Sequence, residues 1–187
     1  MKTAENRNPG DPDARALVER TIRVDQAGEF GAVRIYEGQL AALRWTGRGR
    51  SEASRKIAAM ARAERRHNEE FDRLLTTRRV RPTILSPLWS VAGFALGAAT
   101  ALIGEKAAMA CTVAVEETID EHYAGQAAAL GVDEAELRIT IETFRAEEIE
   151  HRDEALASGA EQAPAYGALT TAIKAGSRLA IWLSTRI

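Results

Sequence analysis

The chain is poor in the features that mark disulfide-stabilised, nucleic-acid-binding and β-sheet proteins. It has a single cysteine, Cys111, which excludes an internal disulfide bond, and the apolar neighbours of this residue indicate a buried, unreactive thiol. The formal net charge is only −2, so no strong field attracts a nucleic acid and no such partner is expected. No stretch alternates with the two-residue period of a half-buried strand, so we expect an all-α protein.

Targeting signals are also missing from the N-terminal sequence. It contains neither an apolar signal region nor an arginine-rich, acid-poor transit segment. We expect residues 1–12 to form a flexible polar tail and residues 13–187 to form a single domain. Together with the lone cysteine, these absences predict a reducing, cytoplasmic setting in a bacterial cell.

Alanine-rich, helix-forming sequence fills most of the chain. Short links at residues 46–50 and 131–133 join the predicted helices in pairs, so each pair should form an antiparallel hairpin. The link between the two pairs is long enough to span a bundle, which is the topology of ferritin-like four-helix bundles. The helices are predicted at residues 13–45, 51–77, 105–130 and 133–158, with a C-terminal helix after Pro164.

Local signals suggest how these helices begin, end and pack. Asp133 with Glu136 resembles a capping box at the start of the fourth helix, and Gly159 is a suitable residue to end it. Gly38 and Gly125 lie inside predicted helices, where each costs about 1 kcal/mol relative to alanine. We interpret this pair as a close backbone approach between the first and third helices.

One metal-ligand pattern occurs twice, because each half of the chain supplies a lone Glu and a Glu-x-x-His pair. The two copies are Glu29 with Glu64 and His67, and Glu116 with Glu148 and His151. Residues three apart lie about 60° from each other on a helix, so each pair can reach into the same core. Four carboxylates and two imidazoles are the ligand set of a di-iron or di-manganese site in a four-helix bundle.

The repetition extends beyond the ligands, since a Tyr follows each lone Glu after seven residues and x-Gly-Gln comes next. These residues are Tyr36, Gly38 and Gln39 in the first half, and Tyr123, Gly125 and Gln126 in the second. Seven residues bring each Tyr back to within about 20° of its Glu, so both should point toward the metals and could hydrogen-bond to ligands. The same repeat favours Glu116 over its neighbour Glu117, while the spacing to His151 favours Glu148 over Glu147 and Glu150.

The pattern also suggests a role for each ligand. We expect Glu64 and Glu148 to bridge the two metals, with one terminal carboxylate and one imidazole on each ion. The terminal ligands would be Glu29, His67, Glu116 and His151.

Three polar residues lie outside this ligand set. His122 is either an ordinary surface or supporting histidine or, beside Tyr123, a group for proton transfer at a quinone-like substrate. Asp25 and Asp120 each share a helix face with a lone Glu and could accept a hydrogen bond from a ligand histidine. We interpret both as ordinary solvated carboxylates.

Residues 82–104 contain no charged residue and form an apolar crossover. The length would allow a transmembrane helix, and Gly93-x-x-x-Gly97 resembles a membrane packing motif. Pro87 interrupts the segment, however, and both metal hairpins must lie on one side to build one site. Two interpretations remain, an apolar helix packed in a soluble core or oligomer interface and a helix lying in the membrane interface, and we favour the second. Trp89 would then lie at headgroup depth.

Positive charge near the crossover and an amphipathic C-terminal helix favour the same membrane interpretation. In that helix, Leu169, Ile173 and Leu183 share a face, although an ordinary bundle helix would look similar. The basic residues expected near the lipid headgroups are Arg78, Arg79, Arg81, Lys174, Arg178 and Arg186.

Further segments of the chain match a known family, namely Ile22–Gly31, Arg81-Pro-Thr, Pro87-Leu-Trp, Gly93–Gly97, Ala110–Glu117 and Ala163-Pro-Ala-Tyr166. Together with both ligand motifs and the apolar crossover, they resemble the demethoxyubiquinone hydroxylases of ubiquinone biosynthesis. The resemblance covers about residues 20–187.

The resemblance implies a membrane-associated di-iron monooxygenase that hydroxylates the ring of a polyprenyl demethoxyubiquinol with O₂. It implies two iron ions per chain, electrons traceable to NADH, and the six ligands named above. The family's active-site His-Tyr pair matches His122 and Tyr123, which are thereby candidate catalytic residues. Gln26 and Glu121 stand where some members have histidine, so any role of those histidines is in doubt here.

The expected partners are a polyprenyl quinone and the lipid surface of the bacterial inner membrane, bound peripherally from the cytoplasmic side. A lipid-binding accessory protein and a homo-oligomer are left open. Three alternatives compete with this hypothesis: a ferritin-like iron store or peroxidase, a quinol oxidase of the alternative-oxidase type, and a metal-free helical bundle with an interaction role. A charged crossover would favour the iron store, whereas residues 82–104 are apolar.

Overall fold

The structure is a computed structural model that describes residues 13–187, so the tail predicted for residues 1–12 lies outside the described residues. The described part contains six α-helices, two short 3₁₀ turns and no strand, which confirms the all-α prediction. The helices are α1 (Ala14–Trp45), α2 (Glu52–Arg78), α3 (Ser86–Ile103), α4 (Glu105–Ala129), α5 (Ala135–Ala157) and α6 (Tyr166–Ser184).

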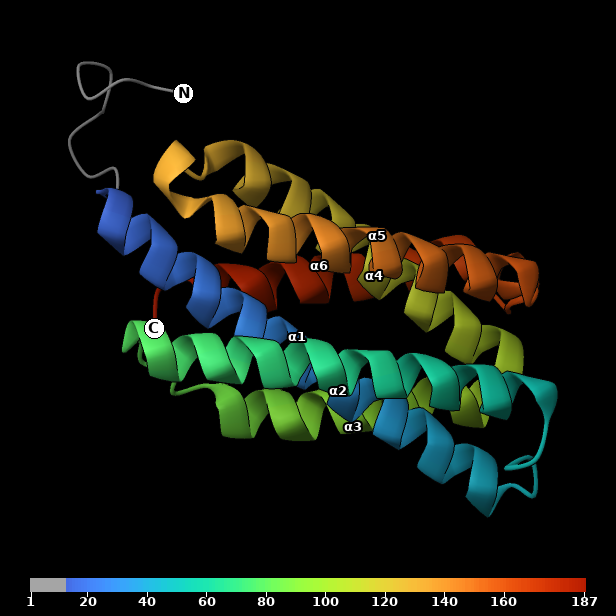
Figure 1. Ribbon diagram of the computed structural model, residues 1–187. Helices are drawn as coiled ribbons and strands as arrows, with labels where there is room; N and C mark the ends of the chain where they lie inside the picture. The colour runs from blue at the N-terminus through green and yellow to red at the C-terminus, as the bar shows by residue number, and fades with distance from the viewer. Residues whose placement is uncertain (1–12) are drawn as a thin grey trace.

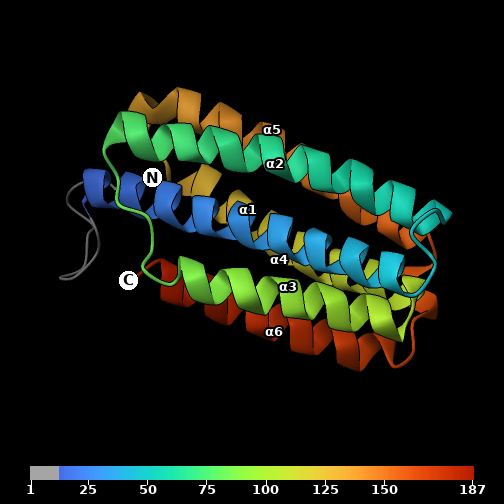
Figure 2. The ribbon, with the colours of Figure 1, turned by 90° about the horizontal axis from the view of Figure 1, so that it is seen from below.

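The helices lie in three layers of two (Figure 2). α2 and α5 form one outer layer, α1 and α4 form the middle layer, and α3 and α6 form the other outer layer. The α1–α2 and α4–α5 hairpins together make the four-helix bundle, with α3 packed against α1 and α6 packed against α4 (Figure 1). This arrangement agrees with the ferritin-like bundle of two hairpins, an apolar crossover helix and a C-terminal helix that the sequence predicts.

Side-chain caps set the start of the two longest helices. The carboxylate of Asp13 accepts a hydrogen bond from the Ala16 backbone N–H at 2.7 Å, and the Ser51 hydroxyl accepts one from Ser54 at 3.1 Å. The capping box predicted at Asp133 is wrong, because a 3₁₀ turn over Val132–Glu134 leads into α5 and no side chain caps that helix. α5 ends at Ala157 with Ser158 as its C-cap, and Gly159 comes next with φ +85°, which confirms the predicted helix end.

The close approach predicted between Gly38 and Gly125 is wrong. A Cβ on Gly38 would overlap the Phe94 carbonyl oxygen of α3, whereas a Cβ on Gly125 would meet nothing within 4 Å. A Cβ on Gly97 would likewise overlap the carbonyl of Ile35 in α1. The glycines of the Gly-x-x-x-Gly motif therefore let α3 pack against α1 at backbone distance.

Apolar clusters fill both ends of the bundle and leave a polar middle. One cluster, near the α1–α2 link, includes Leu43 and Ile57, and the other, near the α4–α5 link, includes Phe71 and Leu137. Cys111 is fully buried beside α6, and burial raises the pKa of its thiol to about 12. The cysteine is therefore the inert thiol that its apolar neighbours predict.

Candidate metal centre

The six predicted ligand residues meet in the middle of the bundle, between the two apolar clusters. Each helix of the bundle contributes to the group, and the three-residue spacing inside each Glu-x-x-His pair places both of its side chains on one helix face. Five of the six side chains are at most 1% exposed, and His151 is 13% exposed. The residues are Glu29 from α1, Glu64 and His67 from α2, Glu116 from α4, and Glu148 and His151 from α5.

These residues form two sets of four, and ligand atoms within each set lie within 4.8 Å of one another. Glu64 and Glu148 belong to both sets, which is the position that bridging carboxylates require. Glu29 and His67 complete the first set, and Glu116 and His151 complete the second. The arrangement suits two metal ions that share two carboxylates.

The imidazoles lie between the shared carboxylates. Nδ1 of His67 lies 3.0 Å from Glu148 Oε1, and Nδ1 of His151 lies 3.0 Å from Glu64 Oε1 and 3.1 Å from Glu148 Oε2. Several of these atoms are close without the angles of a hydrogen bond. Within residues 13–187, buried atoms without a hydrogen-bond partner include Glu29 Oε2, both Glu64 oxygens, His67 Nδ1, Glu116 Oε2 and Glu148 Oε1.

Unpartnered buried carboxylate oxygens are costly, and here they converge on common points. Burial, together with neighbouring carboxylates, raises the pKa of Glu29, Glu64 and Glu116. Burial acts in the same direction on Glu148, but the nearby imidazoles of His151 and His67 stabilise its carboxylate, outweigh burial and lower its pKa to about 2. A cluster of acidic groups with opposed pKa shifts and open lone pairs fits a divalent cation pair, which would offset the repulsion.

Each tyrosine of the repeat donates a hydrogen bond to a predicted ligand, as the spacing suggests. The Tyr36 hydroxyl donates to Glu116 Oε1 at 2.6 Å, and the Tyr123 hydroxyl donates to Glu29 Oε1. The partner is the lone Glu of the other half, because α1 and α4 run in opposite directions (Figure 1). The two halves therefore hold each other's terminal carboxylates.

Two supporting residues escape the sequence analysis. The Glu147 carboxylate lies 3.0 Å from Nε2 of His67 and 2.9 Å from an Arg66 nitrogen, so it can orient the imidazole whose Nδ1 faces the cluster. Phe144 stacks on the same ring with centroids 4.0 Å apart. In the sequence Glu147 is only a rival of Glu148 as a ligand, because no local pattern shows that its side chain faces α2.

The residues outside the ligand set behave differently from one another. Asp25 is 2% exposed and accepts a hydrogen bond from Gln126 at 2.7 Å, so its interpretation as a solvated carboxylate is wrong. Asp120 is partly exposed and forms an ion pair with Arg145 at 2.6 Å. His122 belongs to neither metal set and lines a pocket of about 350 Å³ between α4 and α6.

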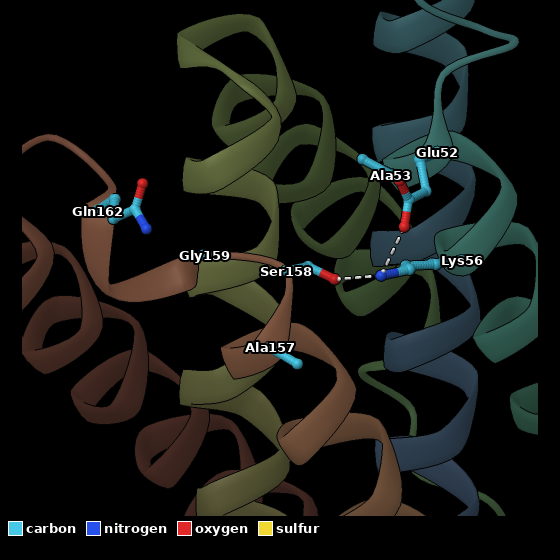
Figure 3. Close-up of a pocket in the computed structure, with 7 residues that line it drawn as sticks. All are labelled: Glu52, Ala53, Lys56, Ala157, Ser158, Gly159 and Gln162. Carbon is cyan, nitrogen blue, oxygen red and sulfur yellow. Dashed lines mark hydrogen bonds and ion pairs between the residues drawn. The ribbon is translucent and has the colours of Figure 1, made fainter.

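A second pocket, of about 290 Å³, lies at the other end of the bundle, where the end of α5 meets the start of α2 (Figure 3). Lys56 extends into it, but its amino group already contacts Glu52 at 3.0 Å, Ser158 at 3.1 Å and Glu154 at 2.7 Å. This amino group serves as a link between the two hairpins.

Together, the bundle and its duplicated, buried Glu/His cluster define a ferritin-like protein with a candidate di-metal carboxylate centre. Comparison with known families assigns the chain more narrowly within this class. Residues 16–184 match the family of the ubiquinone biosynthesis protein COQ7, and the chain belongs to this family, as the sequence resemblance predicts.

Curated relatives agree with this assignment. A 3-demethoxyubiquinol 3-hydroxylase of Rhodospirillum rubrum is 60% identical over 187 residues, which cover 100% of this chain and 86% of the relative. The human NADPH-dependent 3-demethoxyubiquinone 3-hydroxylase, mitochondrial, is 51% identical over 178 residues, which cover 93% of this chain and 80% of the relative. The yeast 5-demethoxyubiquinone hydroxylase, mitochondrial, is 41% identical, with 92% of this chain and 79% of the relative covered.

Proposed function

We propose that this chain is a di-iron monooxygenase that hydroxylates the ring of a polyprenyl demethoxyubiquinol with O₂ in ubiquinone biosynthesis. The observation that carries the proposal is the buried cluster of four carboxylates and two imidazoles in a chain 60% identical to a 3-demethoxyubiquinol 3-hydroxylase. Carboxylate oxygens with a few imidazole nitrogens suit Fe(II), and four carboxylates balance the charge of two divalent ions.

In this proposal Glu64 and Glu148, which belong to both sets, would be shared by the two ions, and the other four ligand residues would each hold one ion. When bound, the iron pair supplies the redox chemistry that activates O₂. The remaining groups hold the ligands: Tyr36 and Tyr123 donate to the terminal carboxylates, and Glu147 lies against the His67 ring. The apolar clusters on both sides keep bulk water from the site.

We further propose that the layer of α3 and α6 faces the membrane that contains the quinone. Large apolar side chains are exposed on both helices, including Leu88 at 54%, Val91 at 70% and Trp182 at 51%. Among the described residues, α3 is the one helix that is long and apolar enough to cross a membrane. Because α3 packs along α1 in the bundle, we favour peripheral binding at the cytoplasmic face of the inner membrane.

The polar contacts around this layer differ in part from the expectation. Arg78 forms an ion pair with Glu134 at 3.0 Å, and Lys174 and Arg178 pair with Glu117 and Glu121 of α4. Trp89 is half-buried and donates its indole N–H to Ser184 of α6 at 2.9 Å. The membrane proposal therefore depends on the exposed apolar side chains more than on these basic residues.

A single assay separates the proposed function from its alternatives. Iron-loaded protein is supplied with a short-tail demethoxyubiquinone, ¹⁸O₂ and either NADH or NADPH, because the human relative is named NADPH-dependent while we propose NADH. A hydroxylated ring that contains one ¹⁸O atom supports the proposal. A quinol oxidase would instead consume O₂ without labelling the ring, and an iron store would yield neither result.

A further inference from the structure

The duplication breaks at two matched pairs of positions near the metal centre. Residues 87 apart correspond in the two halves, as Glu29 does to Glu116 and Tyr36 to Tyr123. By this correspondence Asp25 is the partner of Thr112. The same offset makes Ile35 the partner of His122.

The two polar members of these pairs, Asp25 and His122, lie together. Oδ1 of Asp25 is 3.5 Å from Nε2 of His122, within ion-pair reach but longer than a typical hydrogen bond. The corresponding positions are Thr112, whose hydroxyl within residues 13–187 has no hydrogen-bond partner, and the apolar Ile35. The ligands are thus duplicated, whereas a carboxylate–imidazole pair stands on one side only.

Asp25 is held in place from α4. Its side chain is fully buried, and Gln126 donates to Oδ1 at 2.7 Å. Burial raises the pKa of Asp25, while His122 and Gln126 oppose the shift by stabilising the carboxylate. A buried ionisable side chain needs hydrogen-bond partners, and Oδ2 of Asp25 has none among the described residues.

The pair lies between a pocket and the metal centre. His122 is 23% exposed and lines the α4–α6 pocket with Ile181 and Trp182. Asp25 lies one helical turn before Glu29, and Tyr123, which donates to Glu29, follows His122 directly in the chain.

We propose that Asp25, fixed by Gln126, is a positioning residue that directs Nε2 of His122 toward α1 and so sets the orientation and tautomer of that ring. A carboxylate acceptor at Nε2 places the ring proton there and leaves Nδ1 as the basic nitrogen. His122 can then exchange a proton with a hydroxyl in the α4–α6 pocket on one side of the centre only. This role rests on the proposed function.

The first test compares Asp25→Asn with Thr112→Val, its matched control at the corresponding position of the other half. Asp25→Asn should keep its iron and its KM but lose kcat on the order of 10- to 100-fold, the size of loss seen when a partner that orients a metal-binding imidazole is removed. Thr112→Val should stay within about twofold of the wild type, since it removes no partner of a functional ring. Equal losses in the two variants would overturn the proposal.

A double-mutant cycle then asks whether Asp25 acts through His122. Asp25→Asn combined with His122→Gln should be no slower than His122→Gln alone, because the ring to be positioned is already gone. If the rate losses of the two single variants multiply in the double variant, a positioning role is refuted. Loss of iron in Asp25→Asn would make Asp25 part of the metal centre instead. If Asp25→Asn does not fold, Gln126→Leu takes its place in the same cycle with a smaller expected loss.

Crystal structures of the iron-loaded wild type and Asp25→Asn provide a readout that needs no turnover. Nε2 of His122 should lie within hydrogen-bonding distance of Asp25 in the wild type and should leave position 25 in the variant. A wild-type ring turned away from Asp25 would overturn the proposal. Failure of the wild type to hydroxylate would instead refute the proposed function, while the orientation of the ring would still be measured.

Discussion

At the scale of single residues, the centre depends on contacts that cross from one helix to another. The ligands follow from sequence because each Glu-x-x-His pair is a spacing within one helix, and a helix fixes the direction of both side chains. Asp25 and Glu147 do not follow, since their partners lie 101 and 80 residues away on other helices. No local pattern distinguishes these carboxylates from solvated ones.

The first prediction concerns two of the ligand residues on α5. Glu148→Ala and His151→Ala should each reduce iron well below about two ions per chain and abolish hydroxylation, because each removes a ligand of the centre. Helicity should persist, since neither side chain belongs to the apolar clusters. Elemental analysis and circular dichroism measure both quantities, with Glu150→Ala as the neighbouring control that should retain iron. Full iron occupancy in the two ligand variants would contradict the assignment.

A second prediction at this scale concerns Cys111. Its raised pKa, about 12, keeps the thiol protonated in the folded protein at pH 8, and the thiolate is the reactive form. Iodoacetamide should therefore leave the native protein unmodified and label it once the chain is unfolded in denaturant. Mass spectrometry of both samples gives the answer, and rapid labelling of the native protein would show that the thiol is accessible.

At the scale of secondary-structure elements, α3 is the helix whose packing the sequence leaves most open. The uncharged segment and its glycine motif are visible in the sequence, but the surface against which the glycines pack is not. In the structure the small residues meet the backbone of α1, which explains Gly38 as well as Gly97. The repeat points to Gly125 as the packing partner of Gly38, because the sequence pattern around Gly125 cannot distinguish a buried helix face from an exposed one.

Two glycine substitutions should act in opposite directions. Gly97→Ala should destabilise the protein by about 1–3 kcal/mol, because its Cβ would overlap the backbone of Ile35. Gly125→Ala should stabilise it by up to about 1 kcal/mol, because the position is helical and open. Urea unfolding of both variants gives the two changes in the free energy of unfolding. Equal stability of the two would show that α3 does not pack as described.

The exposed face of α3 should determine membrane binding. Leu88→Ser with Val91→Ser should weaken flotation with liposomes, because both side chains are more than half exposed and would enter the interface. The matched control replaces Val132 and Ile139, which are also exposed but lie away from the α3–α6 layer. Equal weakening of flotation in both double variants would show that binding depends on the overall hydrophobicity of the surface and not on α3. If carbonate at high pH fails to extract the wild type from membranes, α3 spans the bilayer.

At the scale of the whole molecule, the bundle surrounds a group of buried charges that it cannot neutralise alone. A ligand that binds only the folded state stabilises it by about 4 kcal/mol at 1,000 times its Kd. For a chain of this length this corresponds to a rise in Tm of about 10 °C. Scanning calorimetry of iron-loaded and chelator-treated protein should show this rise, and Glu148→Ala should not. An unchanged Tm in the wild type would mean that the cluster does not couple metal binding to folding.

The reciprocal tyrosine contacts have a consequence for how such a chain can be divided. Glu29 receives its hydroxyl from Tyr123, and Glu116 receives its hydroxyl from Tyr36. Each set of four ligand residues also includes a glutamate from the other hairpin. A fragment that contains one hairpin therefore lacks part of both ion sites, and the smallest unit able to assemble the centre is a pair of hairpins. The same geometry would be met by two copies of one ancestral hairpin joined as a symmetric dimer, with Asp25 and His122 marking where fused copies are free to diverge.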